Sequence, residues 1–401
     1  MKGRRLHVLF LDPFHGGSHR AFARGWAERS RHAITILDLP PRFWKWRLRG
    51  AALAFAEKLE RLRETGLARA KRAAGSTARA GRMAEAPARG RPRPFDAVVA
   101  TSLTDAAAFM AAARLRAPLV VYFHENQLSY PRPPGEPLDH GLALASLTSA
   151  AAADAVVFNS QFHRREFFRG LEEWIGRFPE FAPRRTARAI ERKAAVIPPG
   201  IDWEALAPLA ARARESERRP AAGPLILWNH RWEFDKNPGA FFAAMRVLAQ
   251  RGSTYRLALL GENTQFVPTP FLEAKALLGA RIVRYGFAKS EASYRAWLGR
   301  ADIVVSTSRQ ENFGLSVTEA ISAGAFPVLP ARLSYPEILP APLHGACLYR
   351  SQEELIGKLD HLLAHPGTLH DGRRSRSLLM RRYDWSRVAP RLDMLVESLV
   401  R

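Results

Sequence analysis

Two glutamates, Glu311 and Glu319, are the residues of this sequence whose type and spacing point most directly to chemistry. Glu311 follows an apolar run at 301–305 that is typical of a buried parallel strand, and Glu319 lies in the first turns of an amphipathic segment that ends at Gly324. The loop between strand and helix therefore lies where open α/β sheets bind ligands. Since a carboxylate can accept two vicinal hydroxyls, the pair suits the sugar end and the ribose end of one ligand.

The same loop predicts an anion site between the two carboxylates. The backbone amides of Phe313, Gly314 and Leu315 stand at the expected N-terminus of the helix, where they can hold phosphates. Taken alone, Glu311 could also be a charged loop residue and Glu319 a solvated helix residue. The spacing resembles the Glu-x7-Glu signature of retaining glycosyltransferases of the glycogen-synthase-like superfamily (glycosyltransferase family 4). That resemblance implies an α/β protein of the GT-B type, with two Rossmann-like doubly wound domains facing across a cleft.

A pair of cations supports the same interpretation. Arg231 and Lys236 flank a loop after the apolar run that opens the second half of the chain. Two cations at a strand end can grip a diphosphate and stabilise it as a leaving group, although any basic pair on a surface loop would give this pattern. Their spacing resembles the superfamily's diphosphate clamp. Because the sequence contains no Asp-x-Asp pair, we expect no metal and assign no metal ligand.

Three segments narrow the resemblance to one family. They are Asp-Pro-Phe-His-Gly-Gly-Ser-His at 12–19, Phe-Trp-Lys-Trp-Arg at 43–47, and the run from Tyr122 through His124 and Asn126 to Tyr130-Pro131. Together they resemble the tRNA-queuosine mannosyltransferase family, also known as glycosyltransferase-like domain-containing proteins, over nearly the whole chain. The resemblance implies transfer of mannose from GDP-mannose, with retention, to the cyclopentenediol of queuosine in a tRNA.

Site residues in the first half follow from this resemblance and from their setting. Gly16 and Gly17 lie between the first strand and its helix, where backbone can approach the donor's phosphates or sugar. His124 ends a later strand and would face the reacting centre, or would only tie its loop to the backbone. Asn126 would lie near the acceptor.

Basic and aromatic residues predict the tRNA contacts. Trp44, Lys45, Trp46 and Arg47 could stack on bases and pair with phosphates, or the tryptophans could pack under a helix. A basic insertion at about 58–94 contains Arg69, Lys71 and Arg72. It begins as a helix, loosens after Gly75, and either folds onto RNA or is a solvated insertion without a partner. The net charge of +23 would attract a polyanion, or it reflects a bias toward arginine.

Composition bounds the remaining possibilities. The chain of 401 residues is 47% hydrophobic, contains no apolar run long enough to span a bilayer, and shows no secretory cleavage pattern, so we expect a cytoplasmic protein with no membrane or protein partner. The single cysteine, Cys347, is expected in the core. We expect an N-terminal acceptor domain at 1–205, a sugar-nucleotide domain at 206–382, and a C-terminal helix at 383–401 that crosses back to the first domain.

Two other functions remain open from the sequence. The first is a GT-B glycosyltransferase that uses another sugar nucleotide and a small glycan or lipid acceptor, with the positive charge incidental. The second is a non-catalytic RNA-binding protein on the same scaffold. Retention of Glu311, Glu319, Arg231 and Lys236 favours an enzyme.

Overall fold

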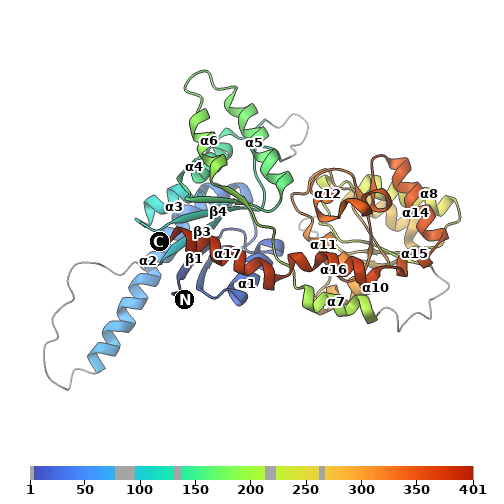
Figure 1. Cartoon of the computed structure of the whole chain (residues 1–401), viewed down its shortest axis with the longest axis horizontal. Helices are drawn as coiled ribbons and strands as arrows, with labels where there is room; N and C mark the ends of the chain where they lie inside the picture. Colours follow the sequence, from blue (N-terminus) through green and yellow to red (C-terminus); the bar gives the residue numbers. More distant parts are fainter. Residues whose placement is uncertain (1–3, 77–94, 131–136, 213–222, 262–266, 401) are drawn as a thin grey trace. The chain divides into compact units, whose positions relative to one another are not determined.

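The chain forms two compact units, each built on its own parallel six-stranded sheet (Figure 1). The computed structural model describes residues 4–76, 95–130, 137–212, 223–261 and 267–400, with side chains for all of these except 66–76 and 212. The first unit holds the chain up to 158, residues 166–197 and the segment from 389 on. The second holds 159–165 and 198–388.

The first sheet has the strand order β2-β1-β3-β4-β5-β6, with every neighbouring pair parallel. A parallel sheet needs crossover helices on its faces, and its central strands β3, β4 and β5 are accordingly buried along their whole length. The strands are β1 (His7–Asp12), β2 (Ala33–Asp38), β3 (Ala97–Thr101), β4 (Leu119–Phe123), β5 (Ala155–Phe158) and β6 (Ala194–Val196).

Alternate residues of these strands pack on opposite faces of the first sheet. Leu9 and Leu11 join a core formed with the helices listed below as α2 to α6. Phe10 faces the other way, where its ring lies 6.1 Å from Phe22 and 5.9 Å from Trp26 of α1. The helices of this unit are α1 (Gly17–Arg29), α2 (Trp44–Ser76), α3 (Ala106–Ala112), α4 (His140–Ala152), α5 (Gln161–Ile175), which begins in the second unit, and α6 (Arg184–Arg192).

The last helix of the chain, α17 (Trp385–Leu399), completes the α1 side of the first unit with its C-terminal half. Asp393 is 2% exposed and accepts hydrogen bonds from the Trp26 indole at 2.8 Å, the Ser30 hydroxyl at 2.6 Å and the Arg31 amide at 3.0 Å. Asp393 therefore links α17 to the end of α1 and the connection that follows it. The three hydrogen bonds compensate the buried carboxylate.

The second sheet has the order β12-β11-β10-β7-β8-β9 and is also parallel. In β7, Leu225 and Leu227 face one core, while Ile226 and Trp228 face the other, so both faces are covered. The strands are β7 (Leu225–Trp228), β8 (Arg256–Leu259), β9 (Ile282–Tyr285), β10 (Ile303–Val305), β11 (Phe326–Pro330) and β12 (Leu348–Tyr349). This arrangement confirms the expected α/β class with two doubly wound sheets.

Helices on the two faces of the second sheet belong to separate cores. One core takes residues of α7 (Trp203–Arg212), α10 (Glu291–Arg300), α11 (Leu315–Ser322), α12 (Tyr335–Ile338), α13 (His344–Cys347) and α16 (Arg373–Met380). The other takes residues of α8 (Pro238–Gln250), α9 (Thr269–Leu278), α14 (Gln352–Ala364) and α15 (Gly367–His370). Short 3-10 turns lie at Phe234–Lys236, Gly279–Arg281, Ala341–Leu343 and Arg381–Tyr383.

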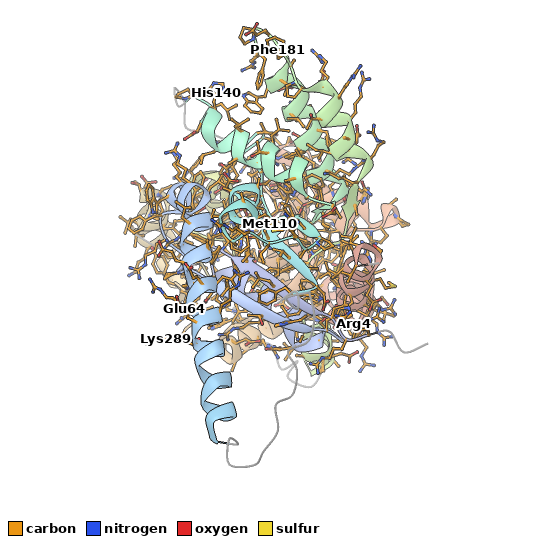
Figure 2. The ribbon with its side chains drawn as sticks, turned by 90° about the vertical axis from the view of Figure 1, so that its left-hand side faces the viewer. Arg4, Glu64, Met110, His140, Phe181 and Lys289 are labelled. Atoms are coloured by element: carbon orange, nitrogen blue, oxygen red, sulfur yellow. The ribbon has the colours of Figure 1, made fainter. Side chains whose placement is uncertain are left out.

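Several predicted elements can be compared with this structure. The basic insertion does begin as a helix, but the helix starts at Trp44, well before residue 58, and continues beyond Glu64 away from the sheet (Figures 1 and 2). The remainder of the insertion, 77–94, lies outside the described residues. Cys347 is buried, as expected, at 1% exposure. Among the described helices, none combines the length and apolar character needed to cross a bilayer.

Candidate active site

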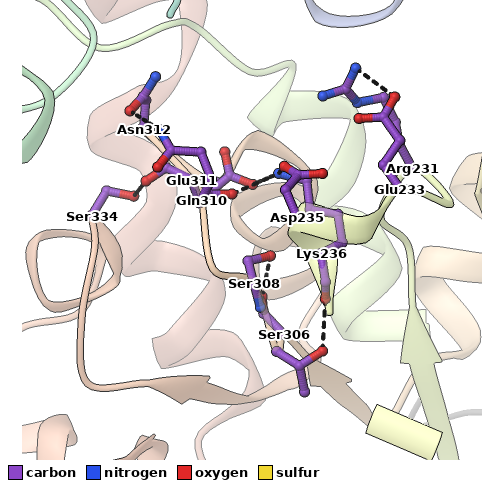
Figure 3. Close-up of polar contacts among 12 residues, drawn as sticks. Arg231, Glu233, Asp235, Lys236, Ser306, Ser308, Gln310, Glu311, Asn312 and Ser334 are labelled. Carbon is purple, nitrogen blue, oxygen red and sulfur yellow. Dashed lines mark hydrogen bonds and ion pairs between the residues drawn. The ribbon is translucent and has the colours of Figure 1, made fainter. Parts of the chain in front are cut away.

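Lys236 and Glu311 lie in direct contact at the carboxyl ends of β7 and β10, which are neighbours in the second sheet (Figure 3). The Lys236 Nζ stands 3.3 Å from Glu311 Oε2 and 3.2 Å from Asp235 Oδ2, and it donates to the Gln310 carbonyl at 2.8 Å. The lysine side chain is only 9% exposed and that of Glu311 is 19% exposed. The sheet order thus brings together a predicted clamp cation and the first glutamate of the signature.

Backbone and hydroxyl contacts hold the two loops that carry this pair. The Thr307 hydroxyl donates to the carbonyls of Lys236 at 2.9 Å and Asn237 at 3.0 Å. The Arg309 amide donates to the Asp235 carbonyl at 2.7 Å. Asn237, with φ 51°, turns the chain into α8, whose first residue is a proline. The loops are therefore fixed to each other before any ligand is present.

The electrostatics of this cluster favour the charged forms of both partners. Burial alone would lower the pKa of Lys236, but the carboxylates of Glu311 and Asp235 raise it. Burial would raise the pKa of Glu311, yet the charges of Lys236 and Arg231 lower it. His230 is the exception, because burial and the nearby Lys236 charge lower its pKa to about 4, which leaves it neutral. The result is a fixed ammonium next to a fixed carboxylate.

Arg231, the other predicted clamp residue, is half-exposed and pairs with Glu233 at 3.0 Å (Figure 3). It is close enough for its charge to contribute to the lowered pKa of Glu311. An exposed ion pair contributes little to stability, so Arg231 can leave Glu233 for an anionic ligand at little cost in free energy.

The N-terminus of α11 follows directly after Glu311. Gly314 precedes the first helical residue with φ 92°, and a Cβ there would stand 3.1 Å from Ile338 Cδ1 and 3.2 Å from Tyr335. The left-handed conformation explains the glycine. The Phe313 side chain is buried against the Tyr383 ring, 5.1 Å away, so only its backbone is available to a ligand. Leu315 begins the helix.

Glu319, the second glutamate, is held by a chain of hydrogen bonds that the sequence pattern does not predict. The Tyr294 hydroxyl of α10 donates to Glu319 Oε2 at 2.8 Å and accepts from Asn229 Nδ2 at 3.1 Å. The Asn229 amide also donates to the Ser316 carbonyl at 2.9 Å. Burial raises the pKa of Glu319 to about 7, although the Tyr294 hydrogen bond works in the opposite direction. Only the three-dimensional packing of α10 against α11 identifies Tyr294.

In the first unit, the glycine pair lies between β1 and α1. A Cβ on Gly16 would stand 2.6 Å from Pro41 Cβ, so this glycine is required by packing. Gly17 has φ 46° with open space around its Cβ position. Gly17 is thus the one of the two that could leave room for a ligand at the start of the helix.

His124 and Asn126 follow β4 in the first unit. The His124 ring packs against the rings of His19 at 4.3 Å and Phe22 at 4.9 Å. Asn126 is 2% exposed, and its Oδ1 accepts from the Leu128 amide at 3.1 Å and the Ser129 amide at 2.9 Å. The Asn126 side-chain oxygen therefore orders the turn after β4.

A polar cluster beside His124 contains residues that sequence reasoning did not assign to the site. Its members are Asp12 at the end of β1, His15 in the loop that follows, His19 in the first turn of α1, Ser102 after β3 and Glu125 after β4. His19 lies between two carboxylates, with Nδ1 3.5 Å from Asp12 and Nε2 3.3 Å from Glu125. A signal was present in the sequence, because polar residues follow three strands that belong to one sheet.

The predicted tRNA contacts at 44–47 form the first turn of α2. Trp46 is 65% exposed, Trp44 is half-buried, and the Lys45 Nζ lies 5.7 Å from the centre of the Trp44 ring. The alternative in which both tryptophans pack under a helix is therefore wrong for Trp46. Arg47 is half-buried on the same turn. Arg69, Lys71 and Arg72 belong to α2, and their side chains lie outside the described residues.

The connection between α5 and α6 carries further exposed residues that no motif of the sequence singled out. Phe181 is 89% exposed at its outer end, with φ 51° (Figure 2). Exposed arginines surround this connection, namely Arg177, Arg184, Arg185 and Arg188. An exposed aromatic among cations is a second surface of the kind expected for nucleic acid.

Known families match both parts of the chain. The family described as tRNA-queuosine alpha-mannosyltransferase N-terminal matches residues 7–201, and the family described as Glycosyl transferases group 1 matches residues 210–375. A tRNA-queuosine alpha-mannosyltransferase from Drosophila melanogaster is 29% identical over 375 residues, which is 91% of this chain and 89% of that protein. These matches cover both sites described above.

Other similarities concern a part of the chain or the fold. A GDP-mannose:cellobiosyl-diphosphopolyprenol alpha-mannosyltransferase from Xanthomonas oryzae pv. oryzae (strain PXO99A) is 27% identical over 172 residues, 42% of this chain and 45% of that protein. Among solved structures, a sucrose-phosphate synthase from Thermosynechococcus elongatus has a TM-score of 0.69 at 16% identity and 99% coverage of both chains. HepE from Anabaena, in complex with UDP and glucose, has a TM-score of 0.66 at 17% identity, covering 98% of this chain and all of HepE. The structural likeness shows the GT-B fold.

Proposed function

Because the chain belongs to the tRNA-queuosine alpha-mannosyltransferase family, we propose that it transfers mannose from GDP-mannose to the cyclopentenediol of queuosine in tRNA. It is a glycosyltransferase, and its group 1 glycosyltransferase segment contains the Lys236–Glu311 contact. The observation that carries the specific proposal is the family match over 7–201, together with a full-length relative of the same description.

The donor would be held by the second unit. Lys236 and Arg231 would bind the diphosphate, with the amides of Phe313, Gly314 and Leu315 at the start of α11 as further donors. Glu311 would accept hydroxyls of the mannose, and Glu319 would accept those of the ribose. Gly17 would allow the backbone at the start of α1 to approach the donor, whereas packing against Pro41 accounts for Gly16.

The reaction would proceed with retention. The bond between the mannose C1 and the diphosphate oxygen breaks, and a bond forms between C1 and a hydroxyl oxygen of the cyclopentenediol on the same face. The hydroxyl proton passes to the departing diphosphate, so charge and atoms balance. The buried Lys236 ammonium stabilises the negative charge that develops on the leaving group, and Arg231 can add to this after leaving Glu233. His124 would lie at the reacting centre. Among the described residues no group of three or more His, Cys, Asp or Glu is placed to hold a metal.

The acceptor would be a tRNA that bears queuosine. The turn at 44–47 and the arginines of α2 would contact its backbone and bases, and Asn126 would shape the loop near the modified nucleoside. A net charge of +23 supports a polyanionic acceptor. Both proposed substrates place the reaction in the cytoplasm.

A different acceptor is the main alternative. The partial similarity to the Xanthomonas mannosyltransferase supports GDP-mannose as donor, but that protein is described as acting on a diphosphopolyprenol glycan. A small glycan or lipid acceptor would leave transfer independent of RNA and only weakly dependent on salt.

A labelled-donor experiment separates these possibilities. The purified full-length chain is incubated with GDP-mannose labelled in the sugar and with total tRNA from cells that make queuosine or from cells that cannot. We expect label only in the queuosine-containing pool. Equal labelling of both pools would contradict the proposed acceptor, and transfer to a polyprenol glycan alone would establish the alternative.

Tyr294→Phe tests the assignment of Glu319 to the ribose. Losing the hydroxyl removes about 1 kcal/mol of hydrogen bonding to the carboxylate, so the KM for GDP-mannose should rise about fivefold with little change in kcat. Tyr255→Phe is the matched control, because its hydroxyl donates to the Met245 carbonyl in the core of the same unit. Steady-state kinetics with both variants measure the effect, and an unchanged KM for Tyr294→Phe would remove Tyr294 from the donor site.

A further inference from the structure

Several ionisable side chains contact one another around His19, at one edge of the first sheet. His15 Nδ1 lies 2.7 Å from Asp12 Oδ2, and His19 bridges Asp12 and Glu125. The Ser102 hydroxyl donates to Glu125 Oε1 at 3.1 Å. The cluster lies at the carboxyl ends of β1, β3 and β4, with His19 contributed by the first turn of α1, and this is the edge at which doubly wound sheets bind ligands.

Folding does not require such a cluster. Asp12 is fully buried and His19 is 7% exposed, so two charged groups are taken out of water where apolar residues could pack. Burial opposes the charge on His19, yet Glu125 and Asp12 raise its pKa to about 10, and His19 with His15 lowers the pKa of Asp12 against the effect of burial. Fixed charges of this kind are characteristic of functional sites.

Exposure within the cluster points to one member as the group that meets a ligand. The Glu125 side chain is 22% exposed, compared with 8% for His19 and none for Asp12. Hydrogen bonds hold both of its carboxylate oxygens, Oε2 to His19 and Oε1 to Ser102. Glu125 therefore presents an oriented carboxylate at the surface of the strand ends.

We propose that Glu125 binds the vicinal diol of the acceptor's cyclopentene ring, and that His19 and Ser102 are positioning residues for it. This inference rests on the proposed function, and it names the group that distinguishes queuosine from guanosine. An ionised carboxylate has about four acceptor positions, so it can accept both hydroxyls of the bound diol while keeping the hydrogen bonds that orient it. In the transfer step the hydroxyl that reacts turns its proton from Glu125 to the departing diphosphate. The secondary amine next to the ring in queuosine carries a positive charge that also favours a carboxylate.

The test compares wild type with Glu125→Gln, which keeps the shape and removes the charge. Losing a charged hydrogen bond of roughly 1.5–3 kcal/mol should lower kcat/KM for queuosine-containing tRNA about 10- to 100-fold. The decisive readout is binding of the same tRNA with queuosine or with guanosine at that position. Wild type should prefer the queuosine form, and the variant should bind both with the affinity that wild type has for the guanosine form.

Controls separate recognition from folding. Glu28→Gln changes an exposed carboxylate of α1 and should leave both affinities unchanged. Affinity for GDP-mannose should stay within twofold of wild type in Glu125→Gln. If that affinity falls as well, or if the variant keeps the preference for queuosine, the inference is wrong. If wild type itself neither prefers nor modifies queuosine-containing tRNA, the proposed function fails instead.

Discussion

Lys236→Met should lower kcat for mannose transfer by a factor of roughly 10²–10³, the effect typical of removing one preorganised electrostatic contact to a transition state. The Lys236 Nζ lies between Asp235 and Glu311, and its side chain is only 9% exposed, so its charge is held in place and poorly screened by water. Steady-state rates at saturating GDP-mannose and tRNA measure the loss. A rate within threefold of wild type would remove Lys236 from the diphosphate site.

Loss of folding has to be separated from loss of chemistry in that variant. Removing the ammonium takes away the cation that lies against the carboxylates of Asp235 and Glu311, which costs about 3–5 kcal/mol of stability. Combining Lys236→Met with Asp235→Asn removes one of these charges and should restore part of the stability, as urea unfolding can show. The rate should stay low in the double variant. Lys289→Met, a change at an exposed lysine of the same unit, should alter neither quantity.

The Glu319→Gln variant should become more stable relative to wild type as the pH rises. Burial raises the pKa of Glu319 in the folded protein to about 7, against an ordinary value of 4.5. Between these values the unfolded chain releases the proton while the folded chain keeps it, so the contribution of Glu319 to the free energy of unfolding falls as the pH increases. Glutamine does not titrate. The unfolding free energy of the variant relative to wild type should therefore rise by up to about 3 kcal/mol between pH 4.5 and pH 8, at 1.36 kcal/mol per pKa unit.

Urea unfolding of both proteins at the two pH values measures this difference. Glu273→Gln, at an exposed carboxylate of α9, should follow the wild type at both. The same Glu319→Gln variant should bind GDP-mannose more weakly, because an amide is a poorer acceptor for two ribose hydroxyls than a carboxylate. A pH-independent difference in stability would show that Glu319 is not a buried, titrating group.

Local patterns in the sequence were enough to predict the α/β fold and to single out the candidate donor residues. Apolar runs followed by loops and amphipathic segments identify strand and helix in order, and a parallel sheet places every following loop at one edge. Arg231, Lys236, Glu311 and Glu319 could be singled out because each belongs to such a loop or the helix after it, and their spacing is a property of the chain alone.

The tertiary structure decided which side chains meet. Glu125 and His19 are 106 positions apart, and they touch only because β1, β3 and β4 are neighbours in the first sheet. Tyr294 reaches Glu319 from another helix, and the Asn126 oxygen, expected near the acceptor, accepts hydrogen bonds within its own turn. These contacts depend on sheet order, helix packing and rotamer, which no local periodicity encodes, so the sequence alone determined the strand ends and only the folded chain determined their partners.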